Sequence, residues 1–309
     1  MDRKIIVIAG PTAVGKTALS IEIARRINGE IVSADSMQIY KGLDVGTAKP
    51  TLKEQALVKH HMIDVCLPEK RYNVADYVSE ASACIEDIFS RGKVPVVTGG
   101  TGLYIDNLIY DNDFGDFELD EGVRDSLSNR AENEGGKALL EELSKIDPET
   151  AGRLHQNDVR RIVRALEIFY STGKTQSYFI KNSRVKKPRY GFCYNVLSCS
   201  DREVLYKRIN SRVDAMLGEG LIDEVKNVLN SHWYENSTAS QAIGYKEFQP
   251  YFRGEKSLDE CVGILKQRSR NYAKRQLTWF RNKKEAFFYN VDTEKNIAES
   301  IIDLYSKGE

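Results

Sequence analysis

The sequence predicts an α/β protein with a parallel sheet core covered by helices, an inserted all-helical domain and further helices at the C-terminal end. Two observations predict this class. Short β-branched runs alternate with helical patterns early in the chain, and a strand pattern returns after an all-helical stretch. The glycine-rich segment Gly10–Thr17 also stands directly between a strand-like run and a helical run. A chain of 309 residues suggests about two domains.

The first part of the predicted sheet is built from four short apolar runs. The helix expected at Gly15–Ile27 follows the first strand, and its apolar residues recur on one face. A second helical stripe, from Val74 to Phe89, precedes the fourth strand. The four predicted strands are Lys4–Ala9, Glu30–Ser33, Met62–Val65 and Val94–Thr98.

The pattern changes near Tyr110. Asp111–Glu121 is polar and turn-rich, and the segments that follow have helical patterns until Gly191–Ser198 returns to a strand pattern. We therefore expect a P-loop NTPase-like core from residues 1–113 and 190–309, and a helical insertion domain from Phe114 to Arg189. The helices expected after the returning strand are Asp201–Leu217, Leu221–Leu229 and Leu258–Phe280.

Composition limits the possible classes of protein. The five cysteines are scattered, with no spacing typical of a zinc site or a disulfide framework, which fits a reducing compartment. No apolar run is long enough to span a bilayer, and no leader pattern precedes the first strand, so we expect a cytoplasmic protein with no membrane partner. Lys and Arg balance Asp and Glu at 45 each, but the charge is segregated: residues 266–284 hold eight basic residues and no acid.

The segment GPTAVGKT at Gly10–Thr17 matches the phosphate-binding pattern GxxxxGK[ST]. Its glycines allow backbone N–H groups to surround an anion, and the following helix adds partial positive charge. The Lys16 ammonium suits a terminal phosphate, and the Thr17 hydroxyl suits magnesium. The motif predicts a bound diphosphate or triphosphate, and by itself it is typical of ATP-binding proteins. The alternative is a glycine turn that packs a helix onto a strand.

Two further polar segments follow predicted strands. Ser33–Tyr40 comes after the second strand, and Gly99–Tyr104 comes after the fourth. Because the carboxyl ends of parallel strands meet at one edge, we expect Asp35 and Thr101 in the same crevice as the phosphate loop. Asp35 could hold magnesium through water or act as a general base, and an Asx turn is the structural alternative. The glycine-rich segment is a weak signal by itself, since such turns are common.

Basic residues at helical spacing suggest phosphate and RNA contacts. Arg208 and Arg212 lie one turn apart, where they could clamp a diphosphate or line a solvated face. Asn157-Asp158 precedes three arginines at a predicted helix start, an arrangement suited to phosphodiester contacts. The last long helix carries Arg268, Tyr272, Arg275 and Trp279 on one face. Such a face suits RNA, whose bases stack on aromatic rings, although core aromatics beside solvated charges give the same pattern.

Taken together, these segments resemble the tRNA dimethylallyltransferase family, also called tRNA isopentenyltransferases, along nearly the whole chain. The phosphate loop alone identifies little, whereas the ordered series is specific. Val14 departs from the family pattern, which often has Ser there, and the lack of a C-terminal zinc finger resembles the compact bacterial form. The matching segments are Gly10–Thr17, Ser33–Pro50 (SADSMQIYKGLDVGTAKP), His60–Val65 (HHMIDV), Gly99–Tyr104 (GGTGLY), Asn157–Ile168 (NDVRRIVRALEI), Gln241–Phe248 (QAIGYKEF) and Lys274–Arg281 (KRQLTWFR).

The resemblance implies a tRNA-modifying prenyltransferase. Such an enzyme transfers a dimethylallyl group from dimethylallyl diphosphate to N6 of the adenine on the 3′ side of the anticodon, and releases diphosphate. The product base is an isopentenyladenosine. The implied cofactor is Mg²⁺, the implied partners are tRNA and dimethylallyl diphosphate, and we expect a monomer.

The resemblance also implies roles for particular residues. Asp35 is the expected general base, and Thr101 is expected near the transferred group. The residues expected to hold the diphosphate are Gly10, Pro11, Thr12, Ala13, Val14, Gly15, Lys16, Thr17 and Arg212, with Thr17 as the metal ligand. The residues expected to contact tRNA are Asp35, Ser36, Met37, Gln38, Thr101, Arg160, Arg161, Ile162, Val163, Arg164, Gln241, Ala242, Ile243, Gly244, Tyr245, Lys246, Lys274, Arg275, Gln276, Leu277, Thr278, Trp279, Phe280 and Arg281.

Three other functions fit parts of the sequence. A kinase or NTPase would place an acidic residue at a strand end, yet Val94–Thr98 runs into Gly99. A transferase acting on free adenine nucleotides would not need the basic helix or the insertion, which favour a macromolecular acceptor. A catalytically silent RNA-binding module would leave Asp35 beside an intact phosphate loop without a role.

Overall fold

The computed structural model describes residues 3–110, 121–182, 187–234 and 237–307. The chain divides into two compact units, one formed by Met1–Ile109 with Pro188–Glu309 and the other by Tyr110–Lys187. Each unit has its own apolar core. The insertion boundary expected at Phe114 lies outside the described residues.

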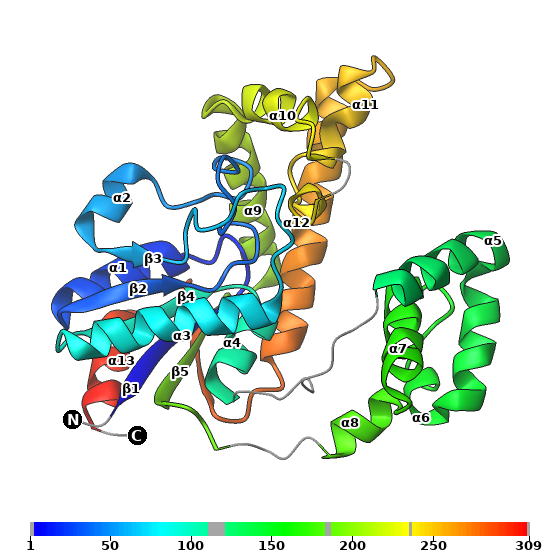
Figure 1. Ribbon diagram of the computed structural model, residues 1–309. Helices are drawn as coiled ribbons and strands as arrows, with labels where there is room; N and C mark the ends of the chain where they lie inside the picture. Colours follow the sequence, from blue (N-terminus) through cyan, green and yellow to red (C-terminus); the bar gives the residue numbers. More distant parts are fainter. Residues whose placement is uncertain (1–2, 111–120, 183–186, 235–236, 308–309) are drawn as a thin grey trace. The chain divides into compact units, whose positions relative to one another are not determined.

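The first unit is built on a six-stranded sheet with the order β3-β2-β4-β1-β5-β6 (Figure 1). All neighbouring strands pair in parallel, as the alternating pattern predicts. Because the central strands are covered on both faces, they consist almost entirely of buried apolar residues. The strands are β1 (Lys4–Ala9), β2 (Gly29–Ser33), β3 (His60–His61), β4 (Val94–Gly99), β5 (Gly191–Ser198) and β6 (Ala286–Asn290).

Helices cover the two faces of this sheet. Side chains of α1, α9 and α13 join Ile6, Ile31 and Val96 in one apolar cluster, while α3 crosses the other face (Figure 1). Helix α3 starts at the capping residue Asn73, whose side chain accepts backbone hydrogen bonds from the first turn. The helices of this unit are α1 (Lys16–Arg26), α2 (Leu52–Leu57), α3 (Val74–Ser90), α4 (Gly102–Tyr110), α9 (Arg202–Gly218), α10 (Leu221–Leu229), α11 (Gln249–Phe252), α12 (Leu258–Phe280) and α13 (Ile297–Ser306), with 3₁₀ turns η2 (Ala239–Gln241) and η3 (Lys246–Phe248).

A second apolar cluster holds the segment after β2 against α9, α10 and α12. Tyr40, Tyr245 and Phe248 are fully buried in it. Burying large aromatic side chains contributes roughly 2–3 kcal/mol each. This cluster therefore fixes the helices on which several of the predicted site residues lie.

The second unit is a helical bundle with a separate core. Leu139 and Leu143 of α5 are fully buried against Ile162 and Leu166 of α7. Helix α7 ends at Gly173, which adopts a left-handed conformation typical of helix ends. The helices of this unit are α5 (Glu121–Ile146), α6 (Pro148–Ala151), α7 (Val159–Thr172) and α8 (Gln176–Asn182).

Most elements predicted from the sequence are confirmed. One strand was predicted at the wrong residues, and some strands and helices were not predicted. The third strand was expected at Met62–Val65 but occupies His60–His61. Met62 and Asp64 have φ angles of 62° and 56°, and this left-handed backbone cannot continue a strand. Strand β6 and helix α13 were not predicted. In the described part of the chain, no helix is both long and apolar enough to cross a membrane.

Candidate active site at the carboxyl ends of the strands

The phosphate loop joins β1 to α1 and is shaped for an anion. A Cβ atom on Gly10 would lie 2.5 Å from the Leu197 carbonyl oxygen, so only glycine fits where the loop passes β5. Ala13 and Gly15 have positive φ angles of 64° and 103°, which curl the backbone before the first turn of α1. Val14 is buried in the apolar cluster that contains Ile6 and Val96. The loop has the same backbone N–H donor whether Val or Ser occupies this position.

Two cations lie at this loop. The Lys16 ammonium donates to the carbonyl oxygens of Gly10 and Pro11 at 3.0 and 2.7 Å. Burial, and then the charge of Arg212, lower the pKa of Lys16 to about 7, while the Asp35 carboxylate opposes the shift. The Arg212 guanidinium of α9 donates to the Thr12 hydroxyl at 3.1 Å, and burial lowers its pKa also. Two half-buried cations beside an anion-shaped loop favour a highly charged ligand such as a diphosphate.

The segment after β2 meets the loop after β4. One Asp35 carboxylate oxygen accepts the backbone N–H groups of Met37 and Gln38 at 2.9 and 3.3 Å, which is the Asx turn left open from the sequence. The Thr101 hydroxyl accepts the backbone N–H of Ser36 at 3.1 Å. The structure therefore brings Asp35 and Thr101 together. Because β1 and β2 both pair in parallel with β4, the segment of Asp35 lies at the same edge of the sheet as the phosphate loop.

Helix α12 contributes three side chains to this site. Gln276 is buried between the phosphate loop and the loop after β4. Burial and the Asp35 charge raise the pKa of Tyr272, while side-chain hydrogen bonds with Thr101 and Gln276 oppose that shift. The Trp279 indole N–H donates to Asp106 Oδ2 at 2.9 Å, and Lys283 contacts the same oxygen at 2.7 Å. The basic and aromatic face expected to bind RNA is thus partly packed into the site.

Two glycines after β4 leave space for these α12 side chains. A Cβ atom on Gly100 would overlap the Gln276 carboxamide nitrogen. A Cβ atom on Gly102 would overlap the Trp279 indole ring. The glycine-rich turn, a weak signal in the sequence, is therefore required by close packing of a helix distant in sequence.

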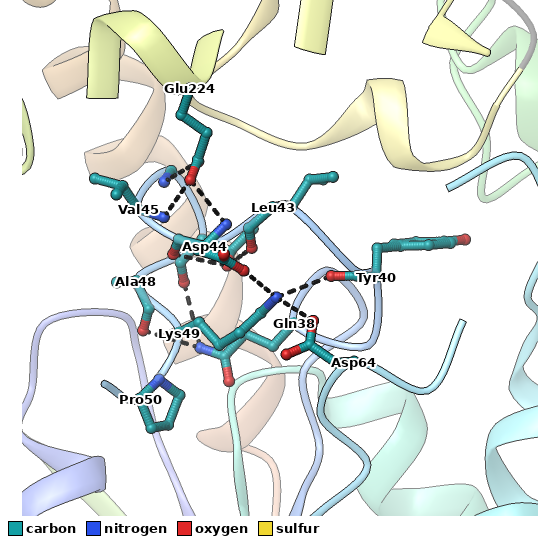
Figure 2. A network of polar contacts seen from close by, with 12 residues as sticks. Gln38, Tyr40, Leu43, Asp44, Val45, Ala48, Lys49, Pro50, Asp64 and Glu224 are labelled. Atoms are coloured by element: carbon teal, nitrogen blue, oxygen red, sulfur yellow. Dashed lines mark hydrogen bonds and ion pairs between the residues drawn. The ribbon is translucent and has the colours of Figure 1, made fainter. Parts of the chain in front are cut away.

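A polar network anchors the segment at residues 38–50 (Figure 2). The Glu224 carboxylate accepts the backbone N–H groups of Asp44, Val45 and Gly46 at 3.1, 2.8 and 2.9 Å, and the Tyr245 hydroxyl donates to it at 2.8 Å. The Tyr245 ring lies where a side chain on Gly46 would stand, 2.7 Å from an added Cβ atom.

The same segment is fixed from its other side by a buried lysine. The Lys49 ammonium, with 4% of the side chain exposed, pairs with Asp64 at 2.6 Å and with Asp44, and donates to the Tyr40 carbonyl at 2.9 Å (Figure 2). The carbonyl oxygen of Ala48 then accepts from Gln38 Nε2 at 3.1 Å. The network thus connects with the residues that follow Asp35.

Of the residues expected to contact tRNA, Asp35–Gln38 and Thr101 are half-buried at the strand ends. The others fall into three groups with different exposure. In α7, Arg160 and Arg161 are exposed, whereas Ile162 and Val163 pack in the core of the second unit. Arg164 pairs with the buried Glu167 at 3.1 Å. These residues belong to the second unit, and all other predicted site residues belong to the first.

The other two groups are also mixed. In Gln241–Lys246, Ala242, Gly244 and Tyr245 are buried, whereas Gln241 and Lys246 are exposed. In Lys274–Arg281, Gln276 and Phe280 are buried. The exposed side chains of that segment are Lys274, Arg275, Thr278, Trp279 and Arg281.

Sequence reasoning did not single out Glu224 or Asp106. In the sequence, Glu224 is an ordinary acid in an amphipathic helix, and no local signal distinguishes it from a solvated residue. Asp106 lies one helical turn after Gly102. This spacing indicates nothing by itself, because both residues contact Trp279, which is distant in sequence.

The GxxxxGK[ST] loop between β1 and α1, with the half-buried Lys16 and Arg212 beside it, places the chain among P-loop proteins. A model of the IPP transferase family matches residues 38–283. A tRNA dimethylallyltransferase of Thermoanaerobacter sp. (strain X514) is 45% identical over 300 residues, which cover 97% of this chain and 95% of that protein. The chain belongs to the IPP transferase family.

Solved structures show the same relationship. The tRNA isopentenylpyrophosphate transferase of Bacillus halodurans is 42% identical, with a TM-score of 0.71, covering 99% of this chain and 95% of that one. A eukaryotic dimethylallyltransferase, described as acting on tRNA, is 32% identical with a TM-score of 0.83, covering 99% of this chain and 80% of that one. The fold expected from the sequence is therefore confirmed.

Proposed function

We propose that this protein transfers a dimethylallyl group from dimethylallyl diphosphate to N6 of the adenine on the 3′ side of the anticodon in tRNA, releasing diphosphate. The observation that carries the proposal is a shared edge of the sheet. The loop that holds Lys16, with Arg212 hydrogen-bonded to Thr12, follows β1, and Asp35 follows β2, and both strands pair in parallel with β4. A leaving-group cradle and a proton acceptor are the two parts that this reaction requires. Family membership supports the same reaction.

The chemistry divides between the two parts. The C1–O bond of the allyl diphosphate breaks, and its electron pair leaves with the diphosphate, which Lys16, Arg212 and the loop N–H groups stabilise. The adenine N6 forms the new bond to C1. Asp35 accepts the proton that N6 loses, while its other hydrogen bonds hold the carboxylate in place.

The site fits a magnesium ion held mainly by the ligand. Thr17 offers a hydroxyl oxygen in the first turn of α1, the position typical of magnesium binding in such loops. Among the described residues, no cluster of three His, Cys, Asp or Glu side chains forms an all-protein metal site. Mg²⁺ commonly takes one or two protein ligands with phosphate oxygens and water, and here it would offset charge on the diphosphate.

The proposed acceptor is a tRNA. An adenine in an RNA loop must leave its stack of bases to reach the site. That extrusion costs a few kcal/mol, which contacts elsewhere on the tRNA must supply. The exposed basic side chains of Arg160, Arg161, Lys246, Lys274 and Arg275 are the proposed contacts. We also propose that the protein is a monomer in the cytoplasm. Light scattering after size-exclusion chromatography tests the oligomeric state.

A product assay tests the proposed function. The protein is incubated with dimethylallyl diphosphate, magnesium and unmodified tRNA, and the digested nucleosides are analysed by mass spectrometry. We expect N6-prenylated adenosine at the position 3′ to the anticodon. Parallel reactions with free adenine nucleotides, and an assay of ATP hydrolysis, provide the contrast: modified free nucleotide or consumed ATP without modified tRNA would contradict the proposal.

A further inference from the structure

Gln276 joins two loops that carry different parts of the site. Its carboxamide oxygen accepts the backbone N–H of Thr12 at 2.9 Å, and its nitrogen donates to the Gly100 carbonyl at 3.0 Å. The first loop follows β1 and the second follows β4, which are neighbouring strands. Only one orientation of the carboxamide satisfies both partners, because the first needs an acceptor and the second needs a donor.

Both partners of Gln276 are adjacent to groups assigned to the reaction. The Thr12 hydroxyl accepts from Arg212 at 3.1 Å, so Thr12 is held through its backbone by α12 and through its side chain by α9. Gly100 directly precedes Thr101. The backbone N–H of Thr101 donates to the carbonyl oxygen of Ala34 at 3.1 Å, and Ala34 directly precedes Asp35. A displacement of Gln276 would therefore be felt by both the diphosphate cradle and the segment of the general base.

The burial of Gln276 distinguishes it from its neighbours in Lys274–Arg281. Only 6% of the residue is exposed, and both ends of its carboxamide have protein partners. Arg275, by contrast, is exposed next to it and lies 5.5 Å from the centre of the Tyr272 ring. A side chain with both polar ends occupied has little left to offer RNA.

We propose that Gln276 is a positioning residue that sets the spacing between the diphosphate loop and the Asp35–Thr101 side of the site. The inference rests on the proposed function and deepens it. Because Gln276 touches neither reacting group, it acts through Thr12 and Gly100. Misplacing reacting groups by about 1 Å costs on the order of 100-fold in rate, so loss of this bridge lowers kcat and leaves tRNA affinity in place.

The test compares Gln276→Met with Gln267→Met, the same change at an exposed glutamine of α12 that is not assigned to the site. Methionine keeps the length of the side chain and removes both hydrogen bonds of Gln276, so we expect the single-turnover rate constant at saturating substrates to fall about 100-fold. Binding of unmodified tRNA, measured by fluorescence anisotropy, should change less than about threefold. Gln267→Met should leave both the rate constant and the tRNA affinity unchanged.

A second variant covers loss of folding. Gln276→Glu retains an acceptor for Thr12 and places an oxygen against the Gly100 carbonyl, so kcat should again fall while tRNA binding persists. Thermal melts show which of the two Gln276 variants is folded. The kinetic and binding results of a folded variant then test the inference.

The possible results separate the inference from the function on which it rests. Retained kcat in a folded variant, or weakened tRNA binding with intact kcat, overturns the inference. A wild-type protein that modifies no tRNA overturns the proposed function and this inference with it.

Discussion

At the scale of single residues, Asp35 offers the cleanest test of the chemistry. Its carboxylate accepts two backbone N–H groups, and an asparagine carbonyl can accept the same two bonds. Asp35→Asn should therefore fold with a stability within about 1 kcal/mol of the wild type. It cannot accept a proton at neutral pH, so we expect transfer to slow about 10²–10⁴-fold, measured as single-turnover product formation.

The control for this substitution is Ser36→Ala, which changes a neighbouring side chain without removing a carboxylate. Its backbone N–H still reaches the Thr101 hydroxyl. An Asp35→Asn variant that retains full transfer activity would exclude Asp35 as the general base.

Lys16 gives the site a pH dependence of binding. Burial, and then the charge of Arg212, lower its pKa to about 7. A bound diphosphate stabilises the ammonium and raises that pKa, so binding above pH 7 takes up a proton. Affinity for diphosphate should therefore be highest below pH 7 and weaken up to about tenfold per pH unit above it.

Calorimetry in buffers of different ionisation enthalpy measures this proton uptake. Lys16→Arg is the matched control, because arginine stays charged throughout the range. The ionisation of the ligand itself is common to both proteins, so the difference between their pH profiles isolates Lys16. Identical profiles for the two proteins would show that Lys16 does not titrate on binding.

At the scale of elements, Glu224 of α10 holds the segment at residues 44–46. Glu224→Ala removes the acceptor of three backbone N–H groups and of the Tyr245 hydroxyl. We expect a loss of about 2–3 kcal/mol in the free energy of unfolding, measured by denaturant titration. Tyr245→Phe removes one of these hydrogen bonds and should cost about 1 kcal/mol.

An equal effect of the two substitutions would contradict the assignment of Glu224 as the main anchor. A change confined to the denaturant slope would instead indicate an altered unfolded state.

The same scale shows how far sequence reasoning reached. The regular elements were predictable because Lys4–Ala9 and Gly191–Ser198 are buried runs, and Leu258–Phe280 carries a clear helical period. The third strand was not, because left-handed backbone at Met62 and Asp64 has no strong local signal.

The candidate site was predictable where a motif carries its chemistry, and not where contacts are distant in sequence. Gly10–Thr17 and Asp35 follow strands, so their common edge could be derived from topology alone. The bridge from Gln276 to Thr12 spans 264 positions, and nothing local to either residue indicates it. Several residues expected at an RNA surface, such as Tyr245 and Phe280, are core residues because their motif includes structural partners as well as exposed ones.

At the scale of the whole molecule, the insertion is joined to the first unit by two neighbouring connections. The backbone N–H of Arg189 donates to the carbonyl of Ile109 at 2.8 Å, so the chain leaves and re-enters that unit at nearly one point. Replacing residues 112–186 with a short glycine-serine linker should leave the first unit folded, with a Tm within about 5 °C of the intact protein. Each unit has its own core, which is why we expect the first unit to fold without the second.

The shortened protein should still bind inorganic diphosphate and should lose tRNA affinity, since Arg160 and Arg161 go with the insertion. Differential scanning calorimetry and a tRNA binding assay check these expectations. A shortened protein that does not fold would show that the first unit depends on the insertion.

The glycines that face large side chains also have a consequence for how this chain can change over generations. Gly46 accommodates Tyr245, Gly100 accommodates Gln276, and Gly102 accommodates Trp279. A side chain at the glycine is tolerated only if its large partner has already been replaced by a smaller residue, so the order of the two changes is fixed in each pair. The motifs after β2 and β4 are thereby tied to Gln241–Phe248 and Lys274–Arg281, and the four segments should be inherited together or lost together.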